Sequence, residues 1–301
     1  MRTTVVHRDD LGDDPVVRRA LAAGAAIRVT EMTCLSDRRA YHPISRPTRP
    51  LVGLCLLRSG GFLLRRNGRE EFIDPTVGFV WRDGDDTHIA HPADTCDVSS
   101  IVDLGVDTYG ECLDWSAVAV LPVASQLDLQ HRALVAACNA GTDQFEVTER
   151  VHGMLSLISA VRRRPGVGPR RAATWTIHRR LVAQVRAALI DGPVTASLDD
   201  LSRHVGVSPF HLSKVFRTVT GQTLARYRNE LRVRAASEAI ADGVPLRTVA
   251  HRFGFADQAH MTRTFRQQLG QTPTQVSVFL RAADGSPGVI ETAKNLQRPA
   301  P

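Results

Sequence analysis

The chain has 301 residues and a formal net charge of +7, and its charge is unevenly distributed. Residues 1–161 contain 16 Lys+Arg against 22 Asp+Glu, whereas residues 162–301 contain 22 against 9. This reversal and the length predict two domains with different partners, the basic one suited to nucleic acid. No run approaches 18 apolar residues, which excludes a transmembrane helix, and 43% hydrophobic residues exclude a wholly disordered chain.

Two further features of composition bear on location and charge. The first ten residues turn acidic before a signal-peptide core can form, and the five cysteines contain no C-x-x-C pair. We therefore expect a cytoplasmic protein, no membrane association and reduced thiols. Only Lys214 and Lys294 are lysines among the 38 basic residues, so an isolated arginine carries little information here.

The segment from Leu51 to Leu104 predicts β-structure. Short apolar runs alternate with turn signals such as Asn67-Gly68, which is typical of a tight hairpin between Phe62–Arg66 and Arg69–Ile73. Many short strands at close spacing favour a sandwich or small barrel.

Helical periodicity begins after Pro122. Gln126–Asn139 and Gln144–Arg162 are predicted helices, and the second carries an apolar stripe that includes Val147, Val151 and Met154. The two helices either cover the β-domain or leave a stripe exposed as a homodimer interface within residues 126–161.

A run of arginine, proline and glycine at residues 162–171 cannot form a helix or a central strand. We predict a β-rich domain over residues 1–161, a linker over 162–174, a helical domain over 175–283 and a disordered tail over 284–301. The fold class is thus a two-domain α+β protein.

The region Leu198–Gly221 has the spacing of a helix-turn-helix. Ser197 and Asp200 predict a capping box for the first helix, and Gly206 suits a sharp turn. Ser208 predicts the cap of a second helix, with Pro209 at its first position.

The same arrangement recurs 48 to 49 residues later. Phe253-Gly254-Phe255 corresponds to Val205-Gly206-Val207, and Thr262–Arg266 corresponds to Ser213–Arg217. The second turn is one residue longer, with Asp257 as its expected cap. A helix over Leu224–Ala241 would be about 27 Å long. It could hold two recognition helices near the separation of about 34 Å between successive major-groove segments.

These two motifs, Ser208–Arg217 with Gly221–Leu224 and Val249–Gln267 with Gly270–Pro273, resemble the DNA-binding domain of AraC/XylS transcriptional regulators. The resemblance covers roughly Ile177–Leu280. It departs from the family pattern at Ala256-Asp257, where a serine is more usual, and at Val276, where an aromatic is common.

The resemblance implies which side chains contact double-stranded DNA. Lys214 and Arg263 can donate to guanine, Gln258 can pair with adenine, and Phe210 can contact a thymine methyl group. Arg217 and Arg266 are better placed for phosphate. The full predicted set is Phe210, Ser213, Lys214, Arg217, Gln258, Ala259, His260, Thr262, Arg263 and Arg266.

The resemblance also implies a cupin-like, jelly-roll N-terminal domain that senses a small-molecule effector, although a purely dimerising domain stays open. Effector-binding candidates are the large side chains in or beside predicted strands: Phe62, Phe79, Trp81, Arg82 and His88. We predict no metal and no cofactor. His88, His91, Cys96 and Asp97 are metal-ligand types, but residues three apart on a strand point to opposite faces.

We therefore predict a ligand-responsive transcription regulator rather than an enzyme. The resemblance implies activation through contact with RNA polymerase, whereas the residues themselves do not distinguish an activator from a repressor. The alternatives are a cupin-type metal-dependent enzyme or an alkyl-transfer repair protein fused to a DNA-binding domain, and an architectural DNA binder. No Ser/His/Asp arrangement or paired carboxylates support an enzyme.

Overall fold

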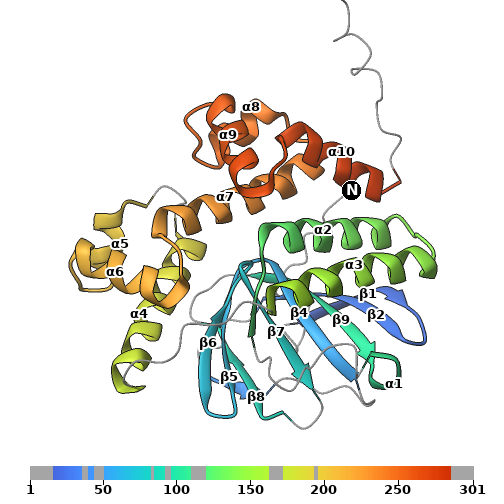
Figure 1. Cartoon of the computed structure of the whole chain (residues 1–301), viewed down its shortest axis with the longest axis horizontal. Helices are drawn as coiled ribbons and strands as arrows, with labels where there is room; N and C mark the ends of the chain where they lie inside the picture. The colour runs from blue at the N-terminus through green and yellow to red at the C-terminus, as the bar shows by residue number, and fades with distance from the viewer. Residues whose placement is uncertain are drawn as a thin grey trace, which may run out of the picture.

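The computed structural model describes residues 16–35, 40–43, 51–82, 85–91, 96–109, 120–162, 172–192 and 196–285. The N-terminal half is rich in β-strands and the C-terminal half is helical, as the sequence predicts (Figure 1). Across these ranges, no helix is both long and apolar enough to cross a membrane. Most of the tail predicted over 284–301, from residue 286 onward, lies outside the described residues.

The larger antiparallel sheet has the strand order β1-β2-β9-β4-β7-β10. Because side chains alternate between the two faces of a strand, Val29, Leu54 and Val102 point to one face of this sheet, and Cys55 and Phe79 to the other. Its strands are β1 (Val16–Ala23), β2 (Ile27–Cys34), β4 (Leu51–Ser59), β7 (Val77–Arg82), β9 (Asp97–Gly105) and β10 (Val120–Pro122).

The smaller antiparallel sheet, in the order β3-β8-β5-β6, covers the face that carries Cys55 and Phe79. The predicted hairpin between β5 and β6 is confirmed: Asn67 and Gly68 have φ values of 48° and 75°, as a tight two-residue turn requires. Its strands are β3 (His42–Pro43), β5 (Phe62–Arg66), β6 (Arg69–Ile73) and β8 (Thr87–Ala90).

The strands upstream of Leu51 were not predicted. Among the described strands, β1 is an edge strand next to β2, and its central residues Arg18, Arg19 and Ala20 are all exposed. An edge strand without a buried face lacks the alternation that reveals strands in a sequence. The described strands of the β-rich half therefore include β1, β2 and β3, upstream of the segment in which the sequence predicts strands.

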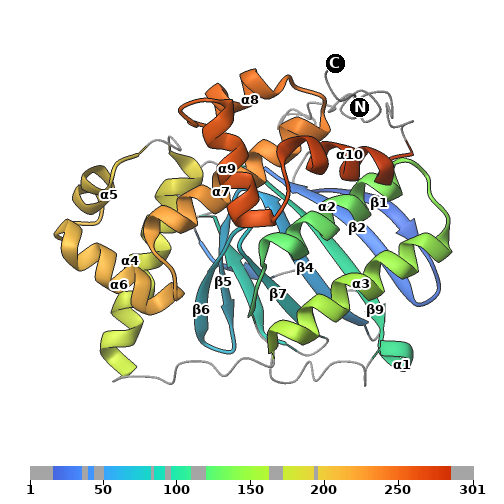
Figure 2. The ribbon, with the colours of Figure 1, turned by 45° about the horizontal axis from the view of Figure 1, so that its top comes forward.

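Helices α2 (Ser125–Asn139) and α3 (Gln144–Arg162) lie across the outer face of the larger sheet (Figures 1 and 2). The predicted stripe of α3 is buried in the same core as the sheet; its described members are Val147, Val151, Met154, Leu155 and Ile158. These helices cover the sheet, so the stripe is not available as a dimer surface. The short helix α1 (Val106–Tyr109) follows β9.

The C-terminal half consists of helices around two separate hydrophobic cores. α7 contributes to both: Leu224 and Tyr227 lie in the first core, and Val233 and Ile240 in the second. The helices are α4 (Ala172–Asp191), α5 (Leu198–His204), α6 (Pro209–Thr220), α7 (Leu224–Ala241), α8 (Leu246–Arg252), α9 (Gln258–Leu269) and α10 (Pro273–Ala283).

The predicted linker over 162–174 is too long at both ends. Arg162 still belongs to α3, and α4 begins at Ala172; residues 163–171 between them lie outside the described residues. The arginine, proline and glycine run indicated where the helices break. It could not locate their ends, because Ala172 and Ala173 are strong helix formers.

Candidate nucleic-acid interface

The first helix-turn-helix is formed by α5 and α6, and local side chains set its helix ends. The Ser197 hydroxyl accepts a hydrogen bond from the Asp200 backbone N–H at 3.1 Å, and the Asp200 carboxylate accepts one from the Ser197 N–H at 3.0 Å. This confirms the predicted capping box. Gly206 adopts a φ of 69° in the turn. Ser208 then accepts from the His211 N–H at 3.2 Å, with Pro209 at the start of α6.

The second helix-turn-helix, formed by α8 and α9, repeats this geometry. Gly254 has a φ of 70°, and the Asp257 carboxylate caps α9 by accepting from the His260 N–H at 2.6 Å. α6 and α9 both contain 12 residues, and each ends at a left-handed glycine, Gly221 or Gly270. The duplication predicted from the sequence is therefore present in the structure, including the cap at Asp257.

Each second helix buries one face and exposes the other. Leu212, Val215 and Phe216 of α6 are buried, as are Met261, Thr264 and Phe265, the residues 49 positions later in α9. The opposite faces carry the predicted DNA contacts. Phe210, Ser213, Lys214, Arg217, Gln258, Ala259, Arg263 and Arg266 are exposed, and His260 and Thr262 are partly buried.

The cationic side chains on these two exposed faces have no partners within the part of the chain that the structure describes. Lys214, Arg217, Arg263 and Arg266 form no side-chain hydrogen bond or ion pair there. Arg203 on the neighbouring α5, in contrast, pairs with Asp200 at 2.5 Å. Four unpaired cations at corresponding positions of two helices are suited to an anionic partner.

Two of the predicted contact residues already make contacts within α9 or with the turn before it. His260 Nδ1 accepts a hydrogen bond from the Ala256 N–H at 3.2 Å, and its ring packs edge-on against Phe255 at 5.7 Å. The Thr262 hydroxyl donates to the Gln258 carbonyl at 2.9 Å. Phe210 is different: it is 80% exposed, although it is a large apolar side chain.

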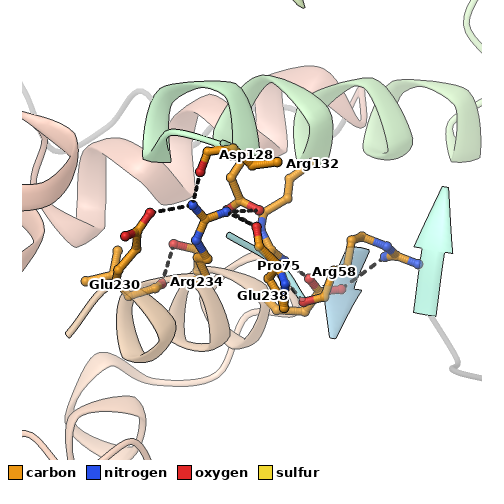
Figure 3. Close-up of polar contacts among 10 residues, drawn as sticks. Arg58, Pro75, Asp128, Arg132, Glu230, Arg234 and Glu238 are labelled. Carbon is orange, nitrogen blue, oxygen red and sulfur yellow. Dashed lines mark hydrogen bonds and ion pairs between the residues drawn. The ribbon is translucent and has the colours of Figure 1, made fainter. Parts of the chain in front are cut away.

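The helix that joins the motifs, α7, also contacts the β-rich half through a polar face. The guanidinium of Arg234, which is buried, donates through Nη1 to the Pro75 carbonyl at 2.6 Å and through Nη2 to the Val123 carbonyl (Figure 3). It also pairs with Asp128 of α2 at 3.0 Å and with Glu230 of α7 at 2.6 Å. One side chain of α7 thus binds two loop carbonyls and two carboxylates.

A second cluster lies one helical turn further along α7. Glu238 pairs with Arg58 of β4 at 3.1 Å and also with Arg132 of α2 (Figure 3). Arg132 in turn donates to Asp128 at 2.9 Å, and Arg58 pairs with Glu31 of β2. The two clusters therefore share Asp128 and form one network between the halves.

A third polar contact places α4 and α7 against the loop after β6. Asp74, which is fully buried, pairs with Arg186 of α4 at 2.6 Å and accepts a hydrogen bond from the Tyr227 hydroxyl of α7. Its other carboxylate oxygen accepts from the N–H and the hydroxyl of Thr76, both at 2.7 Å. Burial, together with the adjacent Asp74 carboxylate, raises the pKa of Tyr227 well above its ordinary value.

Sequence reasoning missed these interdomain residues. The i, i+4, i+8 spacing of Glu230, Arg234 and Glu238 is a detectable signal for ion pairs along a helix. Their partners in the β-rich half lie more than 100 positions away in sequence, at Asp128 and Arg132, and no local pattern identifies them.

The five predicted effector-binding residues lie in two different environments. Phe62 and Phe79 are buried and pack edge-to-face at 6.0 Å, with Trp81 beside them in the core between the sheets. Arg82 lies 3.9 Å from the largely buried carboxylate of Asp85, and His88 lies 3.4 Å from the exposed carboxylate of Asp86. Whether these residues contact an effector stays a prediction.

A cavity of about 760 Å³ lies elsewhere, between the smaller sheet and the helices α4 and α5. Its lining combines apolar side chains with a few charged ones, including Leu63, Phe72, Arg180, Ala187, Leu201 and His204.

Two basic helix-turn-helix motifs joined by one shared helix define a two-motif DNA-binding protein. Residues 201–277 match a helix-turn-helix domain family. The chain is 32% identical over 101 residues to the regulatory protein SoxS of Escherichia coli, a match that covers 32% of this chain and 92% of SoxS. The chain belongs to the AraC family of transcriptional regulators.

Other relatives are matched over smaller parts of their length. The regulatory protein Ada of Salmonella typhimurium is 34% identical over 87 residues, which is 29% of this chain and 25% of Ada. The activator AarP of Providencia stuartii is 32% identical over 88 residues, 28% of this chain and 65% of AarP. The chain thus spans a quarter of the length of Ada and about two thirds of AarP.

Solved structures give weaker similarity. ToxT from Vibrio cholerae aligns over 85% of this chain and 99% of its own at 10% identity, with a TM-score of 0.35. The DNA-binding domain of AdpA aligns over 34% of this chain and 93% of its own at 24% identity, with a TM-score of 0.32. TM-scores this low carry no argument about the arrangement of the halves.

Proposed function

We propose that this protein is a sequence-specific transcription regulator that reads two successive major-groove segments with α6 and α9. The observation that carries the proposal is the pair Lys214 and Arg263, which are exposed, unpaired and 49 positions apart in two copies of one motif. α7 contains 18 residues and is therefore about 27 Å long, so it can hold the two helices near adjacent turns of the groove.

The exposed side chains have distinct proposed roles. Lys214 and Arg263 donate to guanine O6 and N7, Gln258 pairs with adenine, and Phe210 contacts a thymine methyl group. Arg217 and Arg266, one turn further from the helix N-termini, bind phosphate. Ser213, Ala259 and Thr262 lie on the same faces.

The test begins with selection of a binding site from random DNA, followed by affinity measurements on that site and on unrelated DNA. Lys214→Ala and Arg263→Ala should each weaken binding to the selected site by about 5- to 150-fold, the equivalent of about 1–3 kcal/mol. Binding to unrelated DNA should change far less. The matched control is Arg150→Ala, which removes an arginine from α3 in the β-rich half.

An unchanged ratio of affinities for the selected and unrelated DNA in both variants would overturn the assignment of these residues. A chain that selects no preferred site would overturn sequence-specific regulation and favour an architectural DNA binder.

For the N-terminal half we propose a cupin-like jelly-roll that senses a small-molecule effector. Two antiparallel sheets packed face to face support the fold proposal. The 760 Å³ cavity supports an effector site between the halves, lined from β5, β6, α4 and α5, and these lining residues differ from the five predicted from the sequence. A thermal-shift screen of metabolites on Ala187→Trp and wild-type chains tests this, because the added indole should abolish a ligand-induced shift.

The remaining proposals follow from the family. We place the protein in the cytoplasm as a transcription activator that contacts RNA polymerase, with reduced thiols and no catalytic activity. Homodimerisation stays a prediction. The apolar stripe of α3, which suggested a dimer interface, is buried in the core of the β-rich half and no longer supports it. Analytical ultracentrifugation of the full chain tests it directly.

A further inference from the structure

A cluster of three buried side chains, Cys34, His91 and Asp97, lies in the β-sandwich, at the ends of its strands. Cys34 is the last residue of β2, Asp97 is the first residue of β9, and His91 follows β8. Cys34 and Asp97 are direct cross-strand partners, so both side chains leave the same face of the larger sheet. His91 reaches them from the smaller sheet. Both sheets therefore contribute to the cluster.

The three side chains are almost completely inaccessible, with exposed fractions of 5% for Cys34, 0% for His91 and 3% for Asp97. One potential ligand atom from each residue lies within 4.8 Å of the other two. Two ligands of a tetrahedral zinc ion are roughly 3.2–3.8 Å apart, given metal–ligand bonds of about 2.0–2.3 Å. Movements below about 1 Å would thus bring all three atoms to one ion.

His91 and Asp97 already lie at hydrogen-bonding distance, with His91 Nε2 2.9 Å from Asp97 Oδ2. A divalent ion bound by both residues would replace the proton between these two atoms, which would be released to solvent. A neutral imidazole nitrogen and an ionised carboxylate are both ligands of zinc. The other ring nitrogen, His91 Nδ1, is buried and forms no hydrogen bond within the described residues.

We propose that Cys34, His91 and Asp97 form a binding site for a divalent zinc-like cation, with water in the fourth position. A thiolate and an imidazole favour zinc or cobalt over magnesium or calcium, which prefer oxygen ligands alone. On binding, the Cys34 thiol releases its proton to solvent and its sulfur forms a bond to the ion. This proposal replaces the expectation from sequence that the chain binds no metal.

The sequence analysis considers His88, His91, Cys96 and Asp97 as ligand types, and two of these, His91 and Asp97, belong to the cluster. His88 instead lies 3.4 Å from Asp86. The residue that completes the cluster, Cys34, precedes His91 by 57 positions and becomes its neighbour only through strand pairing.

The experiment uses the full chain, stripped with chelator, dialysed and titrated with Co²⁺ as a spectroscopic substitute for zinc. We expect one Co²⁺ per chain, a thiolate-to-cobalt charge-transfer band in the near ultraviolet and the intense visible bands of tetrahedral cobalt. Zinc should displace the cobalt. Cys34→Ser should abolish the charge-transfer band, and Asp97→Asn should weaken Co²⁺ binding by about 10-fold or more.

Cys55→Ala is the matched control, because Cys55 is another buried thiol of the same sandwich and should leave the band unchanged. Circular dichroism of each variant without metal checks folding, and Asp97→Asn retains a test if Cys34→Ser does not fold. A wild-type chain without the charge-transfer band would overturn the proposal. So would a band that survives in Cys34→Ser or that is lost in Cys55→Ala. DNA binding plays no part in these measurements.

Discussion

Replacing Arg234 with methionine is expected to lower the free energy of unfolding by about 3–5 kcal/mol. The guanidinium lies between Asp128 and Glu230 at 3.0 Å and 2.6 Å and also binds the Pro75 and Val123 carbonyls. Methionine has a similar stem and no charge, so it preserves packing while removing every one of these contacts.

The magnitude follows from what the substitution leaves behind. Asp128 and Glu230 are 3% and 8% exposed, so water cannot readily solvate the carboxylates that have lost their partner. Removing one member of a buried ion pair is far more destabilising than removing an exposed pair, which is worth about 0–1 kcal/mol. Arg132 still donates to Asp128 at 2.9 Å in the variant, so Asp128 keeps one cationic partner. The decrease in the free energy of unfolding should therefore not exceed about 5 kcal/mol.

The assay is urea-induced unfolding of the full chain followed by far-ultraviolet circular dichroism. Arg150→Met is the control, because Arg150 pairs at 2.6 Å with Glu146, whose side chain is 45% exposed. Combining Arg234→Met with Glu230→Gln should be less destabilising than the sum of the two single changes, by about 0.5–3 kcal/mol. A loss below about 1 kcal/mol for Arg234→Met, indistinguishable from the control, would refute the reasoning.

Three further outcomes are expected. Burial lowers the pKa of His131 to about 3, so between about pH 6.5 and pH 3 the unfolded chain binds a proton that the folded chain does not. The free energy of unfolding in urea should therefore fall by about 2 kcal/mol between pH 6.5 and pH 5, and it should depend less steeply on pH in His131→Leu. Burial raises the pKa of Asp103 to about 6, so the charged form of this carboxyl opposes folding at neutral pH. Asp103→Asn should therefore raise the free energy of unfolding in urea by about 1–3 kcal/mol at pH 7.5 and change it little at pH 4. Arg217→Ala and Arg266→Ala should each reduce the salt dependence of DNA binding by about one phosphate contact while leaving site preference intact; a changed preference would contradict their role.

The helix-turn-helix motifs could be predicted because their determinants are local. Ser197 with Asp200, Ser208 with Pro209, and the turn at Gly206 each act within four residues, and the structure confirms all of them. The exposed faces of α6 and α9 then follow from helical periodicity.

In the β-rich half, the strands between Leu51 and Leu104 and the hairpin turn at Asn67-Gly68 could be predicted, because apolar runs and turn residues alternate there. The contacts of Cys34 depend on the register between β2 and β9, and those of Arg234 depend on how two domains pack. Both are set by residues distant in sequence, so no window of the sequence contains them.

Helix α2 has a consequence for the independence of the second DNA-binding motif. Leu129 and Ala133 on its outer side belong to the same hydrophobic core as Val249, Phe265 and Leu280, whereas Leu127 and Leu134 belong to the core of the β-rich half. A fragment beginning at α4 would expose that apolar surface to water, and we expect it to aggregate or to bind DNA through its first motif alone. A structural change in the β-sandwich could therefore reach the second recognition helix directly, without passing through the segment between α3 and α4. Residues of α2 and α9 pack in the same hydrophobic core.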